Sequence, residues 1–283
     1  MLPAPESLSR NDFEIVSRRL AEDIAHGMDA SRFIGSGYEY VKSRPYVAGD
    51  STKSIDWKVV ARTGKPFVKE FETLKRTAVH IIVDTSTSMS VSSLSTSKHD
   101  LAVWIAAAIG LAAQSQLRPV SVISGGTRKN LAAGGLGRHE LRRAIEPLRM
   151  PGRREMTNLS RSLDEVNARA VRGSMIVVLS DFYDSQAVPT LRKIAPRHDC
   201  LAIHLVDPAE ESLRGAGMFR AVEAESGRSF VATSSMMDMS RELLRRDIAR
   251  AGASYLRLST AEEFIAPLRH FLATRPAAGG GRG

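Results

Sequence analysis

Residues 79–90 read VHIIVDTSTSMS, a short apolar run that ends abruptly in an aspartate and a series of hydroxyl side chains. An apolar run of this length, bounded by polar residues, indicates a strand that is buried on both faces of a sheet. Similar runs recur later in the chain. We therefore expect strands at Val79–Val83, Val120–Ser124, Met175–Ser180, Leu201–Val206 and Tyr255–Leu258.

Stretches with helical apolar spacing separate these strands. They are expected at Lys98–Gln116, Glu140–Leu148, Asn158–Val171, Ala187–Ala195, Met237–Ala251 and Ala261–Ala273. Strands that alternate with helices favour a doubly wound α/β domain, in which helices cover both faces of a parallel or mostly parallel sheet. We expect this domain at residues 75–273, with a late hairpin formed by Phe219–Glu225 and Ser229–Ala232.

The residues before this domain differ in composition. An amphipathic helix is expected at Asn11–His26, because apolar side chains recur there at intervals of three and four, at Phe13, Val16, Leu20 and Ile24. Between residues 35 and 72, glycines and prolines punctuate short runs, which is typical of strands and turns. We therefore predict a strand-rich N-terminal extension at residues 1–74 and a disordered low-complexity tail at residues 274–283.

Polar side chains cluster at the predicted carboxyl ends of the strands, where ligands bind in open α/β sheets. Mg²⁺ prefers an octahedron of oxygen ligands, which carboxylates and hydroxyls can supply. The sequence therefore predicts a site for Mg²⁺, or for another divalent cation such as Mn²⁺. The alternative is that these residues only cap the helix that follows the first strand. The candidate ligands, from three separate segments, are Asp84, Ser86, Ser88, Thr157 and Asp181.

This set resembles the metal-ion-dependent adhesion site of von Willebrand factor A domains. The resemblance lies in the Asp-x-Ser-x-Ser motif at 84–88, a separate threonine at 157 and an aspartate that closes a strand at 181. It implies a von Willebrand factor A-like fold in which Ser86, Ser88 and, in one conformation, Thr157 bind the metal directly. Asp84 and Asp181 would act directly or through water. The sixth position would be left for an acidic side chain of a partner.

A second resemblance covers nearly the whole chain. GSGYEY at 35–40, RPYVAGD at 44–50, SIDWKVVARTG at 54–64 and KEFE at 69–72 are similar to the domain of unknown function 58 family, whose members accompany MoxR-type AAA+ ATPases. VDPAEE at 206–211, ESGR at 225–228, YLRLSTAEEF at 255–264 and LRHFLATR at 268–275 extend the similarity. The resemblance implies a protein that works with such an ATPase in maturing or remodelling a client protein.

The first part of this signature also has a physical interpretation of its own. Its charged residues are of both signs and stand among aromatic ones, which predicts a charge-paired platform packed on the main sheet. The functional alternative is a partner-binding face. The residues concerned are Arg44, Asp50, Asp56, Lys58, Arg62 and Lys69, with Tyr46, Trp57 and Phe67 between them.

Composition leaves two competing functions open. A net charge of +9 and a pI of about 10.0 suit an acidic partner such as nucleic acid, although no nucleic-acid-binding motif is visible. A metal-dependent phosphoesterase would need more carboxylates and a base beside the ion. The leading prediction is a non-catalytic, metal-dependent adaptor for an ATPase and its client.

Cellular location is predicted from cysteine content and from apolar segments. Cys200 is the single cysteine, which suits a reducing compartment, and it lies in a predicted strand, where we expect it to be buried. The first residues show neither a basic segment nor an apolar one of the kind found in secretory signals. We therefore expect a cytoplasmic protein with no membrane span.

Overall fold

The computed structural model describes residues 2–30, 38–47, 50–73, 77–127, 135, 137–151, 155–212, 218–222 and 229–275. The chain divides into two units. The first, called the sheet unit below, comprises Met1–Ser31 and Thr77–Gly283, and the second, called the small unit, comprises Arg32–Arg76.

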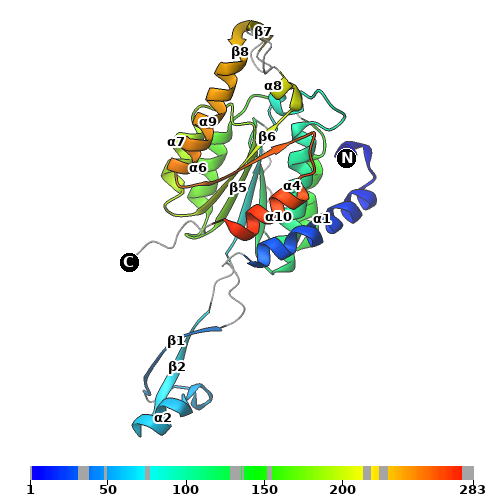
Figure 1. Cartoon of the computed structure of the whole chain (residues 1–283). Helices are drawn as coiled ribbons and strands as arrows, with labels where there is room; N and C mark the ends of the chain where they lie inside the picture. Colours follow the sequence, from blue (N-terminus) through cyan, green and yellow to red (C-terminus); the bar gives the residue numbers. More distant parts are fainter. Residues whose placement is uncertain are drawn as a thin grey trace. The chain divides into compact units, whose positions relative to one another are not determined.

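The sheet unit is built on five parallel strands in the order β4-β3-β5-β6-β9 (Figure 1). Every strand predicted for this sheet is present, which confirms the α/β class. Three of them have the predicted bounds, while β6 and β9 extend one or two residues further. The bounds are β3 Val79–Val83, β4 Val120–Ser124, β5 Met175–Ser180, β6 Asp199–Val206 and β9 Ser254–Ser259.

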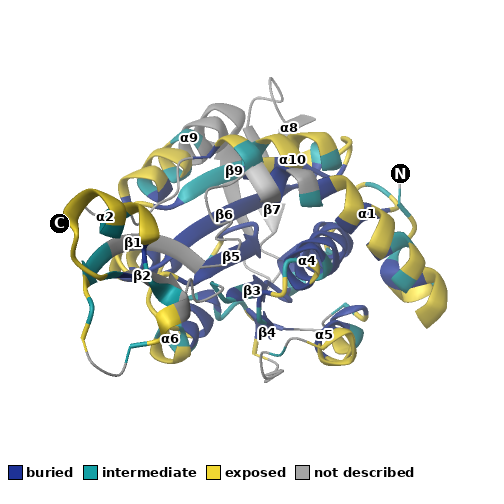
Figure 2. Ribbon diagram, turned by 90° about the horizontal axis from the view of Figure 1, so that it is seen from below, coloured by how far each residue is buried: buried dark blue, intermediate teal, exposed yellow. Residues whose placement is uncertain are grey.

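Two apolar cores lie on opposite faces of the sheet because successive strand residues point to opposite sides. On β3, Ile81 belongs to the core under α1, α4, α5 and α10, whereas Ile82 belongs to the core under α6, α7 and α9. Figure 2 shows the central strands in the buried colour between these helices. Cys200 on β6 is buried, as predicted.

The helices agree with prediction within a few residues. Their bounds are α4 Lys98–Ser115, α5 Arg138–Ile145, α6 Leu159–Arg169, α7 Ala187–Ile194, α9 Ser234–Arg250 and α10 Ile265–Thr274. Helix α10 begins later than expected because the Glu263 carboxylate accepts hydrogen bonds from the backbone N–H groups of Ile265 and Ala266, which fixes its first turn. Short helices are η1 Pro5–Ser7, α3 Thr87–Ser90, η3 Glu146–Leu148 and α8 Pro208–Ser212.

Helix α1 (Arg10–Ala30) corrects the predicted division of the chain. It was expected to form part of an extension at residues 1–74, but it belongs to the sheet unit and contacts α4 and α10. Its Phe13 ring stacks on Trp104 of α4, with ring centroids 4.7 Å apart. The apolar face that predicted the helix is therefore the reason that it joins the larger core.

The late hairpin is confirmed as β7 Met218–Val222 paired antiparallel with β8 Ser229–Thr233. The ESGR motif at 225–228 and most of the predicted tail lie outside the described residues. In the part of the chain that the structure describes, no helix is both long and apolar enough to span a membrane.

The small unit contains β1 Tyr38–Pro45 and β2 Phe67–Thr73, paired antiparallel, with η2 Thr52–Ser54 and α2 Trp57–Thr63 between them. The predicted charge pairing is confirmed for Arg44, which binds both oxygens of Asp50 at 2.7 Å and lowers the pKa of that carboxyl to about 2. Asp56 caps α2 by accepting hydrogen bonds from two backbone N–H groups. Trp57 is 68% exposed.

Candidate metal centre at the carboxyl edge of the sheet

The carboxyl ends of β3 and β5 form the switch point of the sheet. The chain leaves β3 for α4 on one face and leaves β5 for α7 on the other, so the two connections diverge. Such a divergence is where open α/β sheets bind ligands. Asp84 follows β3 and Asp181 follows β5, so the sheet order brings together two segments that are far apart in the sequence.

Asp84 is the centre of the hydrogen-bond network at this edge. Its side chain is fully buried, and its Oδ1 accepts a 2.9 Å hydrogen bond from the backbone N–H of Ser86. Its Oδ2 accepts hydrogen bonds from the hydroxyls of Ser180, at 2.6 Å, and Thr157, at 3.4 Å. One carboxylate therefore connects the segments after β3, before α6 and at the end of β5.

Ser86 and Ser88 present two buried hydroxyls whose oxygens lie 3.1 Å apart. Ser86 stands at the N-cap position of α3, yet its side chain makes no capping hydrogen bond there. The cap of α4 is instead Ser97, which forms a capping box with Asp100. The alternative in which Ser86 serves only as a helix cap is therefore not what the structure shows.

The segment that carries Thr157 is fixed by residues that the sequence analysis did not identify. Glu155 accepts a 2.5 Å hydrogen bond from the Thr85 hydroxyl, and its backbone oxygen accepts one of 2.9 Å from the N–H of Thr87. Gly126 pairs with Thr157 in an isolated bridge. A Cβ atom at Gly126 would lie 2.4 Å from Thr85 Oγ1, so any larger residue here would have to displace the Thr85 side chain.

Asp181 is held by a buried lysine. Its Oδ2 accepts a 2.9 Å hydrogen bond from Nζ of Lys98, whose side chain is 2% exposed. The same ammonium lies 2.7 Å from Oε1 of Glu210 on α8 and 5.6 Å from the ring centroid of Tyr183. The Oδ1 atom of Asp181 is buried and has no hydrogen-bond partner among the described residues.

The backbone turns sharply directly after Asp181. Phe182 has a φ of 59°, in the left-handed region that non-glycine residues rarely adopt. Its N–H donates a 2.9 Å hydrogen bond to the Ser180 hydroxyl, which itself donates to Asp84. Strained backbone of this kind persists where surrounding contacts fix it, often at functional sites.

Asp207, directly after β6, lies at the same carboxyl edge of the sheet. Asp207 accepts hydrogen bonds from the Ser93 hydroxyl at 2.5 Å, the Ser93 N–H at 2.9 Å and the Ser92 hydroxyl at 3.1 Å. Burial acts to raise the pKa of Asp207, but these hydrogen bonds outweigh it and lower the pKa. The loop between α3 and α4 is thereby tied to the sheet.

The surroundings of Asp84 shift the pKa of its carboxyl group strongly. Burial and then the nearby charge of Asp181 raise its pKa to about 7, although hydrogen bonds from Ser180 and Ser86 act in the opposite direction. Burial acts to lower the pKa of Lys98, but the carboxylates of Asp181 and Glu210 hold it above its usual range. The cluster thus combines two crowded carboxylates with one charged lysine.

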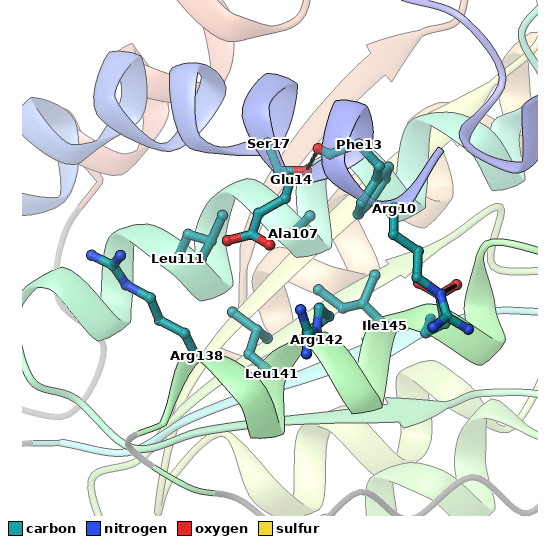
Figure 3. Close-up of a pocket in the computed structure, with 11 residues that line it drawn as sticks. Arg10, Phe13, Glu14, Ser17, Ala107, Leu111, Arg138, Leu141, Arg142 and Ile145 are labelled. Atoms are coloured by element: carbon teal, nitrogen blue, oxygen red, sulfur yellow. Dashed lines mark hydrogen bonds and ion pairs between the residues drawn. The ribbon is translucent and has the colours of Figure 1, made fainter. Parts of the chain in front are cut away.

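A separate hollow lies between α1, α4 and α5, and none of the candidate ligands lines it (Figure 3). Its volume is about 40 Å³, far smaller than the pockets of several hundred Å³ that hold small molecules. Its apolar floor includes Phe13 and Leu141, and arginines stand at its rim. The chemistry of the sheet edge is therefore not part of this hollow.

Comparisons with known proteins place the chain in a family. The model of the family described as protein of unknown function DUF58 matches residues 42–255. The uncharacterized proteins Mb1516 of Mycobacterium bovis and Rv1480 of Mycobacterium tuberculosis are each 30% identical over 276 residues, which cover 93% of this chain and 87% of theirs.

Among solved structures, the conserved hypothetical protein BatB from Bacteroides thetaiotaomicron is similar with a TM-score of 0.47 and 14% identity, covering 70% of this chain and 97% of BatB. The PilB minor pilin from Streptococcus sanguinis follows with a TM-score of 0.41 and 10% identity, covering 75% of this chain and 64% of that one. The matched residues include most of the small unit and, in the sheet unit, β3, β4, β5, β6 and the first two residues of β9. The chain belongs to the protein family of unknown function DUF58.

Proposed function

We propose that the sheet edge binds Mg²⁺ or Mn²⁺ and that the bound ion docks an acidic side chain of a partner protein. The residues that would hold the ion are Asp84, Ser86, Ser88, Thr157 and Asp181. In this proposal the protein is an adaptor, without a reaction of its own, for a MoxR-type AAA+ ATPase and a client protein. The fold would be a von Willebrand factor A-like variant of the α/β sheet.

The observation that carries the proposal is the buried Oδ1 of Asp181, which has no hydrogen-bond partner among the described residues. A buried carboxylate oxygen without a partner costs free energy, and such groups in native proteins are satisfied by a donor, a water or an ion. Asp181 acts electrostatically on Asp84, so this oxygen belongs to the same cluster. A cation beside both carboxylates would satisfy it.

The charges of the cluster support a divalent ion. Burial and then the charge of Asp181 raise the pKa of Asp84, so the two carboxylates destabilise each other's ionised form. Lys98 pairs with Asp181 and Glu210 but makes no ion pair with Asp84 among the described residues. A divalent cation beside both aspartates would offset the burial and the repulsion of their charges.

The ligand types support a hard, small ion. Among the described residues, no three His, Cys, Asp or Glu side chains gather as a metal site, so hydroxyl groups would have to complete the coordination. The hydroxyls of Ser86 and Ser88 are adjacent, and that of Thr157 donates to Asp84. Mg²⁺ takes oxygen ligands and retains several waters, which suits few carboxylates and several hydroxyls. A retained water is what a partner carboxylate would replace.

A direct test compares Asp84→Ala with Asp164→Ala, an exposed aspartate on α6 that serves as the matched control. We expect Mg²⁺ to raise the unfolding temperature of the wild type and of Asp164→Ala, because an ion that binds only the folded state stabilises it. Asp84→Ala should stay folded without responding to Mg²⁺. Circular dichroism in the presence of Mg²⁺ or chelator measures both effects.

Partner binding is tested separately with a purified MoxR-type ATPase. Capture of the ATPase should require Mg²⁺, disappear with chelator and be lost in Asp84→Ala only. Capture that persists in chelator would contradict the adaptor proposal. Binding to DNA that is indifferent to chelator and falls steeply with salt would instead support the nucleic-acid alternative suggested by the net charge of +9.

A further inference from the structure

Lys98 occupies an unusual position for a cation. It is the first residue of α4, where the helix dipole disfavours positive charge. Its side chain is nevertheless buried, and its ammonium reaches Asp181 at 2.9 Å and Glu210 at 2.7 Å. These contacts, and not the helix, explain why a lysine is tolerated here.

The lysine removes one of the two oxygens that Asp181 could offer to a metal. Oδ2 is engaged with Nζ of Lys98, which leaves only the unpartnered Oδ1. Asp84 is limited in a similar way, because its Oδ2 accepts a 2.6 Å hydrogen bond from Ser180 and its Oδ1 accepts one from the Ser86 N–H. Neither carboxylate is arranged to bind an ion with both oxygens.

This restriction distinguishes between divalent ions of equal charge. Ca²⁺ takes six to eight oxygens and commonly uses a carboxylate through both of them, whereas Mg²⁺ requires a near-ideal octahedron and binds a carboxylate through one. We propose that Lys98 is a positioning residue that makes Asp181 a one-oxygen ligand and so gives the site its preference for Mg²⁺ or Mn²⁺ over Ca²⁺. The inference rests on the proposed metal site.

Lys98 is also prevented from swinging away. Glu210 on α8 holds the ammonium from a second side, and the ring of Tyr183 lies 5.6 Å from it. A lysine with one exposed carboxylate partner would exchange freely with solvent. A lysine held by two carboxylates and an aromatic ring keeps Oδ2 of Asp181 occupied while an ion binds at Oδ1.

The experiment measures the ratio of Mg²⁺ to Ca²⁺ affinity by calorimetric titration of the full chain. The ratio is informative because a change in local charge affects two divalent ions alike, whereas a change in available oxygens does not. The main variant is Lys98→Met with Glu210→Gln. It removes one positive and one negative charge, so the net charge of the cluster is kept while Oδ2 of Asp181 is released.

We expect the ratio to fall by about 10-fold in this double variant, chiefly through tighter Ca²⁺ binding. Lys98→Gln can still donate to Oδ2 and should keep a ratio close to that of the wild type. Lys193→Met, an exposed lysine on α7, should also leave it unchanged. If the double variant does not fold, Lys98→Ser with Glu210→Gln, which leaves space for water, replaces it.

The outcomes separate this inference from the proposed function. Binding of both ions with the same ratio in every variant would overturn the role of Lys98 and leave the metal site standing. Failure of the wild type to bind any divalent ion would overturn both. A ratio that falls equally in Lys98→Gln and in the double variant would show that a donor to Oδ2 is not what keeps the preference, and this too would overturn the inference.

Discussion

Ser180, the last residue of β5, donates a 2.6 Å hydrogen bond to Oδ2 of Asp84, the first residue after β3. The hydroxyl also accepts a hydrogen bond from the N–H of Phe182. It therefore links the central carboxylate of the cluster to the strained turn that follows Asp181. This pairing of two neighbouring strand ends is what fixes the geometry of the proposed site.

Replacing Ser180 with alanine should remove both hydrogen bonds at once. We expect a loss of about 2 kcal/mol in the free energy of unfolding, because a buried carboxylate loses a donor and a backbone N–H loses an acceptor. Chemical denaturation measures it. Ser185→Ala, at an exposed serine that follows the same strand, is the control and should change stability by less than about 0.5 kcal/mol.

The raised pKa of Asp84 predicts a dependence of stability on pH. A carboxyl whose pKa is about 7 in the folded state and 3.8 in the unfolded state stabilises the fold below pH 3.8, and this contribution is lost as pH rises towards 7. In chelator, Asp84→Asn should therefore gain stability relative to wild type as pH rises from 4 to 8.

Comparing Asp84→Asn with the wild type removes the contribution of other titrating groups to the pH dependence of stability. Burial lowers the pKa of His80 to about 4, so the folded state favours the neutral form of this side chain. The contribution of His80 to stability therefore rises with pH, which is opposite to that of Asp84. Both proteins contain His80, so its contribution cancels in the difference between their free energies of unfolding. A difference that does not vary with pH would contradict the raised pKa that burial and the nearby charge of Asp181 give to Asp84. Saturating Mg²⁺ should stabilise the wild type alone.

Gly126→Ala should disturb the segment that carries Thr157. The added methyl group would lie 2.4 Å from Thr85 Oγ1 and 2.6 Å from Glu155 Oε2, so this hydrogen-bonded pair must separate. We expect a destabilisation of about 1–3 kcal/mol together with weaker stabilisation by Mg²⁺. Gly137→Ala is the matched control, because its nearest contact would be an ordinary 3.6 Å. Thermal unfolding with and without Mg²⁺ measures both effects.

Phe13→Ala tests whether α1 is part of the sheet unit. The ring is 8% exposed and stacks on Trp104, so its removal should cost about 3 kcal/mol in unfolding free energy. Ile15→Ala, on the exposed side of the same helix, should cost much less, since Ile15 is 53% exposed. Equal effects of the two substitutions would argue against the docking of α1. Denaturant titration followed by tryptophan fluorescence measures both.

The sequence by itself was sufficient for the strands of the sheet and for the polar side chains at their carboxyl ends. The central strands β3, β5 and β6 are mostly apolar runs because both of their faces are covered, and that pattern depends only on neighbouring residues. The positions of Asp84 and Asp181 at strand ends follow from the same runs. Helix α1 was predicted from its apolar face, but the core that this face joins depends on Trp104 and other distant residues.

Tertiary structure alone decided how the cluster is held together. Lys98 was predicted only as the start of a helix, because its partners Asp181 and Glu210 lie 83 and 112 residues away in the sequence. Ser180 looked like the last residue of a strand, and Glu155 had no recognisable pattern. The local sequence shows which side chains can be buried or can form hydrogen bonds, whereas the order of strands in the sheet determines which of them come into contact.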